Sequence, residues 1–170
     1  DGFVVELTTM GPAHSTNDVA VWLPAQRVLF AGDLAFSGGH PIFMEGSMLG
    51  FRAALARIRA LAPDALLPGH GPACRGDDVV RVLDDLETYV DYVAGITSDS
   101  YAAGLTPLEA AQRHHADSPY RDWPEGERLV CNLHRAYVEL TDYEPPFPLS
   151  IPNLWPEMVA LHGGPIVSHA

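Results

Sequence analysis

The sequence predicts an α/β fold in its front half and a helical extension in its back half. Short runs rich in β-branched and aromatic residues, bounded by turn residues, recur up to residue 67, which is typical of strands. From residue 77 onward, apolar residues recur at helical spacing instead. Hydrophobic residues make up 47% and charged residues 19% of the 170 residues, a composition typical of a globular domain.

Four strands are predicted ahead of the helical extension. The opening run has strand composition from its second residue onward. A second strand ends at Pro24, and the short turn after it pairs it with a third strand as a hairpin. The fourth is short and entirely apolar. The predicted strands are residues 2–8, 18–24, 27–31 and 65–67.

Five helices are predicted from their caps and their apolar spacing. Ser47 can cap a helix that Pro63 ends, and Asp77 or its neighbour opens a long amphipathic helix. Thr106, followed by a proline and with Glu109 three residues on, has the pattern of a capping box. The predicted helices are residues 48–61, 77–96, 107–116, 125–140 and 153–161.

This order of elements predicts two segments of one domain. Residues 1–75 hold the strands and one helix, and residues 76–170 form the extension, which we expect to pack on the same domain. Four short strands have too few partners to close a core alone, and the chain opens directly on strand-type residues. We therefore expect a piece of a longer protein; a short edge strand at a true N-terminus is the alternative.

Charge and cysteine content argue against several partners. The formal net charge is −12 and every basic residue is Arg, so nucleic acid and anionic membrane surfaces are not expected partners. No apolar run reaches the length of a membrane span. Two cysteines, Cys74 and Cys131, cannot build a disulfide framework, which favours a reducing compartment and hence a cytoplasmic location.

Three segments place a metal-ligand residue beside small residues at a predicted strand end. They contain His14, Asp33 and His70, with a glycine close to each in sequence. Imidazole nitrogen and carboxylate oxygen are ligands that zinc prefers where a site keeps an open position. Each residue alone has a structural explanation, as a hydrogen-bonded His or a turn Asp. Their order and spacing together predict a metal site.

This series resembles the C-terminal half of the metallo-β-lactamase superfamily. Members carry a His after a Gly-rich turn, a strand ending in Trp/Leu-Pro, a hairpin to Phe-x-Gly-Asp, a helix, and a strand ending in Gly-His. The corresponding elements here are His14, residues 19–24, 30–33 and 48–61, and Gly69-His70. The resemblance covers about residues 2–75 and implies half of a four-layer αββα metallo-β-lactamase fold, followed by the helical extension.

The resemblance also implies a ligand set and a missing half-site. His14 would bind the first metal, Asp33 would bridge two metals as the catalytic carboxylate, and His70 would bind the second. The remaining ligands come, in the family, from a His-x-His-x-Asp-His motif, which this sequence lacks. We therefore expect two Zn²⁺ per complete site and, as partner, a missing N-terminal polypeptide of the same protein. A homodimer is a further option.

The implied function is a binuclear zinc hydrolase that uses a metal-bound hydroxide on a thioester, lactone or ester. A β-lactam substrate is disfavoured because there is no Lys to hold its carboxylate, and a nuclease is disfavoured by the charge. The alternatives are a thioesterase–cyclase acting on a carrier-bound aromatic polyketide, a mononuclear Fe²⁺ oxygenase of the persulfide dioxygenase type, and a non-catalytic remnant of the fold.

Apolar residues beside the predicted ligands suggest how a small-molecule or carrier-bound acyl substrate is held. His40 lies in the loop after Asp33, where family members contact substrate, and the apolar residues near it would suit an acyl group. For each of them, ordinary core packing is the competing interpretation. The candidate substrate-binding residues are Phe36, His40, Phe43 and Met44.

Overall fold

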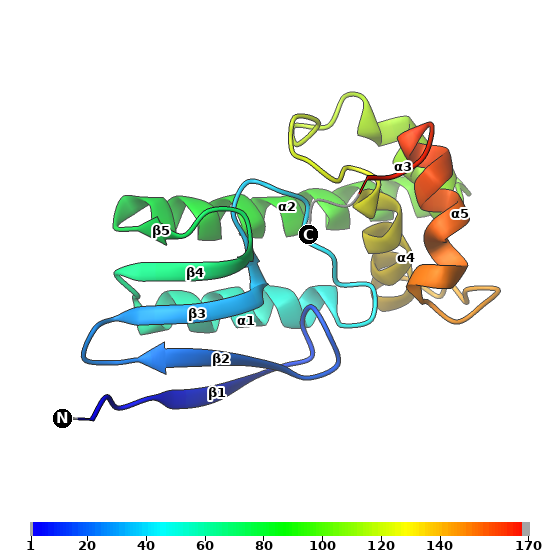
Figure 1. The fold of residues 1–170 in the computed structure, drawn as a ribbon. Coiled ribbons are helices and arrows are strands. Elements are labelled where there is room, and N and C mark those ends of the chain that lie inside the picture. Colours follow the sequence, from blue (N-terminus) through cyan, green and yellow to red (C-terminus); the bar gives the residue numbers. More distant parts are fainter. Residues whose placement is uncertain (1, 168–170) are drawn as a thin grey trace.

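The computed structural model describes residues 2–167, which form a mixed five-stranded sheet and five helices. The strands lie in sequence order across the sheet (Figure 1). Neighbouring strands are antiparallel except for the central pair β3 and β4, which is parallel. The strands are β1 (Glu6–Gly11), β2 (Asp18–Leu23), β3 (Val28–Phe36), β4 (Ala65–His70) and β5 (Cys74–Arg75). The predicted α/β fold class is confirmed.

Helix α1 (Met48–Leu61) connects the two parallel strands, as a crossover between parallel neighbours requires. Its bounds are those predicted from the sequence, because its signals are local. The Ser47 side chain accepts a hydrogen bond from the Gly50 amide at the helix start. Pro63 follows the left-handed Ala62 at its end, where the helix cannot continue.

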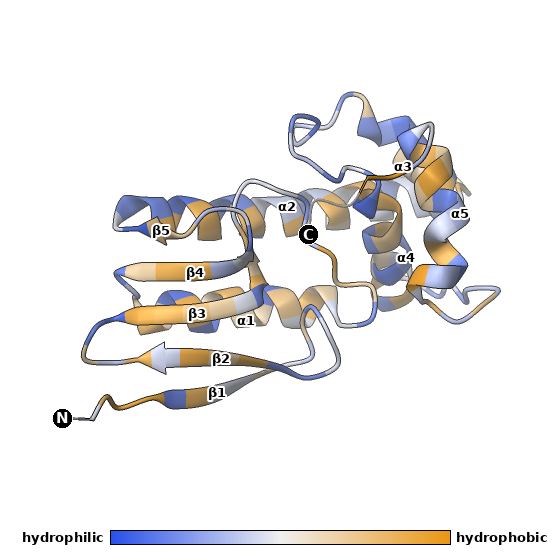
Figure 2. Cartoon of the chain, viewed as in Figure 1, coloured by the Kyte–Doolittle hydropathy of each residue, from blue (hydrophilic) through white to orange (hydrophobic). Residues whose placement is uncertain are grey.

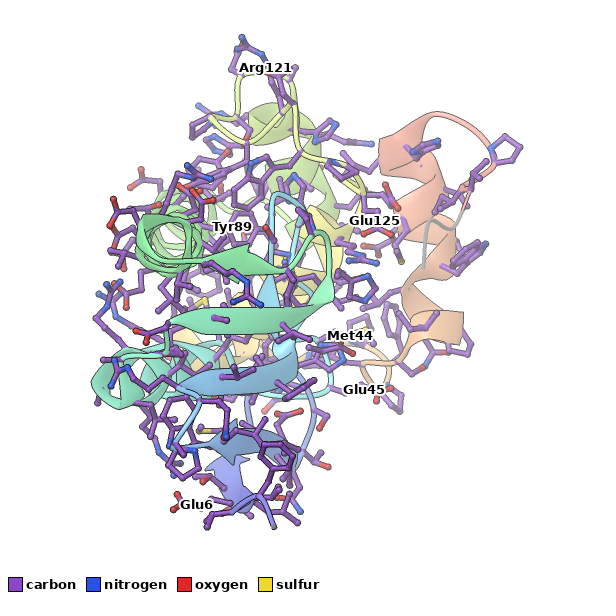
Figure 3. The ribbon with its side chains drawn as sticks, turned by 60° about the vertical axis from the view of Figure 1, so that its left-hand side comes forward. Glu6, Met44, Glu45, Tyr89, Arg121 and Glu125 are labelled. Carbon is purple, nitrogen blue, oxygen red and sulfur yellow. The ribbon has the colours of Figure 1, made fainter. Side chains whose placement is uncertain are left out.

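One face of the sheet is covered by α1 and by α2 (Asp77–Ala102), which lie on the same side of it (Figures 1 and 3). The side chains on this face come from residues paired across the strands. Trp22 pairs with Leu29, Leu29 with Leu66, and Leu66 with Cys74, and all four are buried. Burying this row against two helices gives the domain its core.

The opposite face of the sheet carries a second apolar row. Leu7 pairs with Val21, Val21 with Phe30, and Phe30 with Leu67, one residue out of phase with the buried row. Leu7 is 72% exposed and Phe30 is 42% exposed. β3 is accordingly apolar on both faces (Figure 2), a pattern expected of a strand with cover on both sides.

The helical extension is joined to the sheet by α2, which packs on α1, β3 and β5 and also on α3 and α4. The other helices lie beyond the end of the sheet (Figure 1). They are α3 (Pro107–His115), α4 (Arg128–Leu140) and α5 (Ile151–His162). One continuous hydrophobic core includes residues before and after position 76; the division at that position stays a prediction.

Several predicted bounds were wrong. β1 begins at Glu6, whereas strand structure was expected from Gly2. β3 continues to Phe36, five residues beyond the predicted end, because it pairs with β4 as far as His70. α2 continues to Ala102, and the two-residue β5 was missed altogether. In residues 2–167, no helix combines the length and the apolar character needed to cross a membrane.

A buried polar cluster ties the extension to the loop after β3. The Tyr89 hydroxyl is 3.1 Å from His40 Nδ1, and the Asn132 amide donates to it at 2.9 Å. His40 Nε2 lies 3.2 Å from the Tyr120 carbonyl, which can only accept. The ring is therefore a neutral tautomer that donates from Nε2. Burial lowers the pKa of His40 to about 4.

The buried neutral state of His40 predicts acid sensitivity of the fold. The unfolded chain binds the His40 proton near pH 6.5 and the folded chain only near pH 4, so stability falls as pH drops through this window. We expect a loss of about 2 kcal/mol in unfolding free energy between pH 7 and pH 5 from this group. Urea unfolding of the wild type and His40→Gln at both pH values measures it. An equal loss in both proteins would contradict the assignment.

Candidate metal centre

The structure brings His14, Asp33 and His70 together at the carboxyl ends of the parallel strands. His14 lies in the β1–β2 loop, Asp33 on β3 and His70 at the end of β4. His14 Nε2 is 3.4 Å from Asp33 Oδ2, and His70 Nε2 is 3.6 Å from Asp33 Oδ1. Each imidazole therefore faces a different oxygen of one carboxylate. We call these three residues the His–Asp–His cluster.

The spacing within the cluster fits shared metal ligation better than direct hydrogen bonding. Both nitrogen–oxygen distances exceed the 2.7–3.2 Å typical of a hydrogen bond. Two ligands on one tetrahedral zinc, with bonds of about 2.0–2.1 Å, stand about 3.3 Å apart. Each His–oxygen pair matches one edge of such a tetrahedron. The donor set of imidazole and carboxylate also suits zinc.

The cluster does not form a complete metal site by itself. Within residues 2–167, no three His, Cys, Asp or Glu side chains are grouped so that they could hold one ion. Asp33 gives one oxygen to each side, so each ion would receive two protein ligands from this chain. A zinc site needs three or four. A complete zinc site here would need further ligands from other groups.

The orientation of His14 is set by a backbone carbonyl. Its Nδ1 lies 2.6 Å from the Ile42 oxygen, and because a carbonyl can only accept, Nδ1 carries the proton. In the neutral ring, the lone pair is then on Nε2, which faces Asp33. Hydrogen bonds of this kind to the outer nitrogen are typical of metal-ligating histidines.

The loop that supplies this carbonyl is held by one face of α4. Arg128 donates to the His40 oxygen at 2.9 Å and Arg135 to the Met44 oxygen at 2.8 Å. Between them, Asn132 donates to the Pro41 oxygen and accepts from the Phe43 amide. Residues 128, 132 and 135 share a helix face. The extension thereby fixes the 40–44 loop and, through it, the His14 ring.

A carboxylate outside the cluster fixes the other side of the His14 loop. Asp18 accepts from the Ala13 amide at 3.0 Å and from the amide and hydroxyl of Ser15, the latter at 2.7 Å. These three bonds surround His14 in the chain and close the loop that presents it. The sequence places Asp18 close to His14, but only the folded loop reveals which atoms it binds.

His70 stacks on an aromatic ring that belongs to the core. The Phe36 ring is parallel to the imidazole with centroids 4.8 Å apart, and the Arg128 guanidinium lies over Phe36 at 5.8 Å. Phe36 is also 6.1 Å from the His14 ring. This buried ring thus packs near both imidazoles.

Close approach of β4 to the carboxylate requires a glycine. A Cβ on Gly69 would lie 1.9 Å from Asp33 Oδ1 and 2.8 Å from the Asp33 amide. Any side chain there would displace the carboxylate from its position between the imidazoles. Packing against Asp33 therefore requires glycine immediately before His70.

The predicted substrate-binding residues lie beside the cluster but are enclosed. His40 and Phe43 have no exposed surface, and Phe36 and Met44 are nearly as buried. Met44 lines a hollow next to His14. A substrate role for these four residues stays a prediction. Cys74 and Cys131 are buried and unpaired, and burial raises the pKa of both thiols, that of Cys131 to about 12.

Comparisons with known proteins find one family over the front part of the chain. Residues 1–70 match the family model of the metallo-beta-lactamase superfamily. The chain is 23% identical over 127 residues to a Beta-lactamase-like protein 2 homolog of Caenorhabditis elegans, covering 71% of this chain and 40% of that protein. It is 30% identical over 78 residues to Metallo-beta-lactamase type 2 of Bacteroides fragilis, covering 42% and 30%.

Among solved structures, the DIM-1 metallo-beta-lactamase aligns with a TM-score of 0.44 at 19% identity, covering 52% of this chain and 42% of its own. The front part of the chain, residues 1–70, is thus similar to the metallo-β-lactamase superfamily by its family model, and two curated relatives carry related names. The chain spans less than half the length of the curated relatives it matches.

Gly69→Ala tests whether the Asp33 position matters for metal binding. The added methyl group would push the carboxylate away, and we expect zinc affinity to fall about 10- to 100-fold, the range for disturbed ligand support. Calorimetric titration with zinc measures it. Gly95→Ala in α2, where a Cβ meets nothing within 4 Å, is the matched control. Equal zinc affinities in the two variants would contradict the role of the close Gly69–Asp33 approach in metal binding.

Proposed function

We propose that the chain supplies His14, Asp33 and His70 to a two-zinc centre that hydrolyses a thioester, lactone or ester. The observation that carries this proposal is the division of the Asp33 carboxylate, with one oxygen toward each imidazole. A single-iron site formed by two His and one Asp would need all three groups around one ion. The two separate edges favour two ions, although iron remains an outcome of the test below.

Bound zinc would supply Lewis acidity toward a carbonyl and would lower the pKa of a water molecule. The residues of this chain hold and orient the donors. Ile42 keeps the His14 proton on Nδ1, so that Nε2 is free to bind. Asp33 would neutralise charge between the two positions, and Phe36 stacks on His70 and lies near His14.

The remaining ligands, in this proposal, come from a polypeptide that covers the exposed face of the sheet. The row of Leu7, Val21, Phe30 and Leu67 is apolar and continuous across four strands, and contiguous apolar surface of this kind marks an interaction site. We assign the cover to an N-terminal stretch of the same protein. Two observations support this choice. The cluster has too few ligands for a zinc site, and this chain matches less than half the length of each curated relative.

Removal and return of metal tests the hydrolase. Chelation should abolish hydrolysis of simple thioesters, lactones and esters, and zinc should restore it. In Asp33→Asn we expect kcat/KM to fall more than the roughly 100-fold that loss of a supporting contact costs. Asp85→Asn, the same change at an exposed residue on α2 away from the cluster, is the control. Recovery with iron alone would move the assignment to an oxygenase, and release of a cyclised product from a carrier-bound polyketide would identify a thioesterase–cyclase.

Native mass spectrometry of the purified protein with a metal readout tests the covering partner. We expect a second polypeptide of the same protein to travel with this chain together with two zinc ions. Phe30→Asp should weaken the complex, because it places a charge in the centre of the apolar row. Val80→Asp, at a residue 50% exposed on α2, should not. A complex of two copies of this chain would replace the partner with a homodimer.

A further inference from the structure

Three hollows surround the His–Asp–His cluster on the side of the extension. The first, of about 170 Å³, lies against His14 and is otherwise lined mainly by apolar residues, among them Met44 and Ile151. The second, of about 200 Å³, lies between the start of α4 and α5, which contributes Ile151, Trp155 and Met158. The third, of about 210 Å³, lies against His70 and Ser37. The two histidines of the cluster thus line the first and the third hollow of this series.

The hollows share walls. Ile42 and Ile151 line both the first and the second, and Glu125 lines both the second and the third. Figure 3 shows Met44 and Glu45 at one end and Glu125 at the other, on the side of the body that α5 covers. The first and second hollows adjoin at Ile42 and Ile151, and the second and third adjoin at Glu125. We call these adjoining hollows the cleft; His14 lines the first and His70 the third.

The α5 wall of the cleft is apolar and accessible. Trp155 is 43% exposed and Ile151 is 37% exposed, and Met158 lies beside them. Large apolar side chains left open on the wall of a cleft beside chemically active groups are typical of a small-molecule site. Helix α5 was expected from the sequence, but its role in lining the site was not.

Charge in the cleft disfavours an anion. Arg128 is the only Lys or Arg lining the three hollows among residues 2–167, and it is neutralised. Its guanidinium is 2.6 Å from the Glu125 carboxylate, with both side chains nearly buried. Glu45 and Glu127 add negative charge to the walls, with Glu127 3.5 Å from His162.

We propose that this cleft binds an uncharged apolar acyl chain along α5 and presents its ester or thioester group to the His–Asp–His cluster. The proposal rests on the hydrolytic function proposed above and names its substrate class. Apolar contact with Trp155 and Ile151 supplies the affinity. The glutamates exclude chains that end in a carboxylate or phosphate.

The test compares two probes of equal length on the metal-free full chain, in the presence of a chelator. Octanamide is neutral and octanoate is anionic. Calorimetry should show octanamide binding about tenfold more tightly, the factor for ~1.4 kcal/mol of charge repulsion. Trp155→Ala should weaken octanamide binding about tenfold through lost apolar contact. Val80→Ala, at an exposed apolar residue on α2, should leave it unchanged.

A gain of binding guards against a variant that merely misfolds. Glu45 is exposed at the cleft, and Glu45→Lys should raise octanoate affinity about tenfold through the reversed charge. Two results would overturn the proposal: equal affinity of the wild type for both probes, or unchanged octanamide affinity in Trp155→Ala. Probe binding is measured without metal, so a failure of the hydrolysis assay would not contradict it. Likewise, a failure of probe binding would not contradict metal-dependent hydrolysis.

Discussion

The arrangement of the candidate metal centre depends on one hydrogen bond, from the His14 Nδ1 proton to the Ile42 carbonyl. That carbonyl belongs to a loop whose backbone is held at both ends and in the middle by Arg128, Asn132 and Arg135 of α4. The helical extension is therefore a structural requirement of the site, because it fixes the atom that sets the tautomer and direction of a ligand more than one hundred residues away in the chain.

Within residues 2–167, the sheet has one uncovered apolar face and the cluster has too few ligands for a complete zinc site. One face of the sheet is buried by α1 and α2, while Leu7 and Phe30 leave the other face apolar and open. The Asp33 carboxylate divides its oxygens between two imidazoles, which gives each side half of what a zinc ion needs. A single segment that covered the apolar face of the sheet could also bring the further ligands. The proposed hydrolase therefore depends on the proposed partner.

The extension also lines the cleft beside the cluster. α5 brings Ile151 and Trp155 to it, and Arg128, the one arginine lining it within residues 2–167, is paired with Glu125. The same residue, Arg128, lies over Phe36, which supports His70. Loop position, ligand support and cleft charge therefore meet in the first two turns of α4, and a change there should alter all three.

The sequence alone determined the features that depend on local chemistry. The bounds of α1 follow from Ser47 and Pro63, the capping box of α3 from Thr106 and Glu109, and the cluster residues from their place beside glycines at strand ends. Tertiary structure decided the features that depend on distant pairing. The length of β3 depends on pairing with β4, the position of the 40–44 loop depends on α4, and one wall of the cleft is formed by α5. These contacts join segments far apart in the chain, and the local sequence pattern of one segment does not indicate which other segment it will contact.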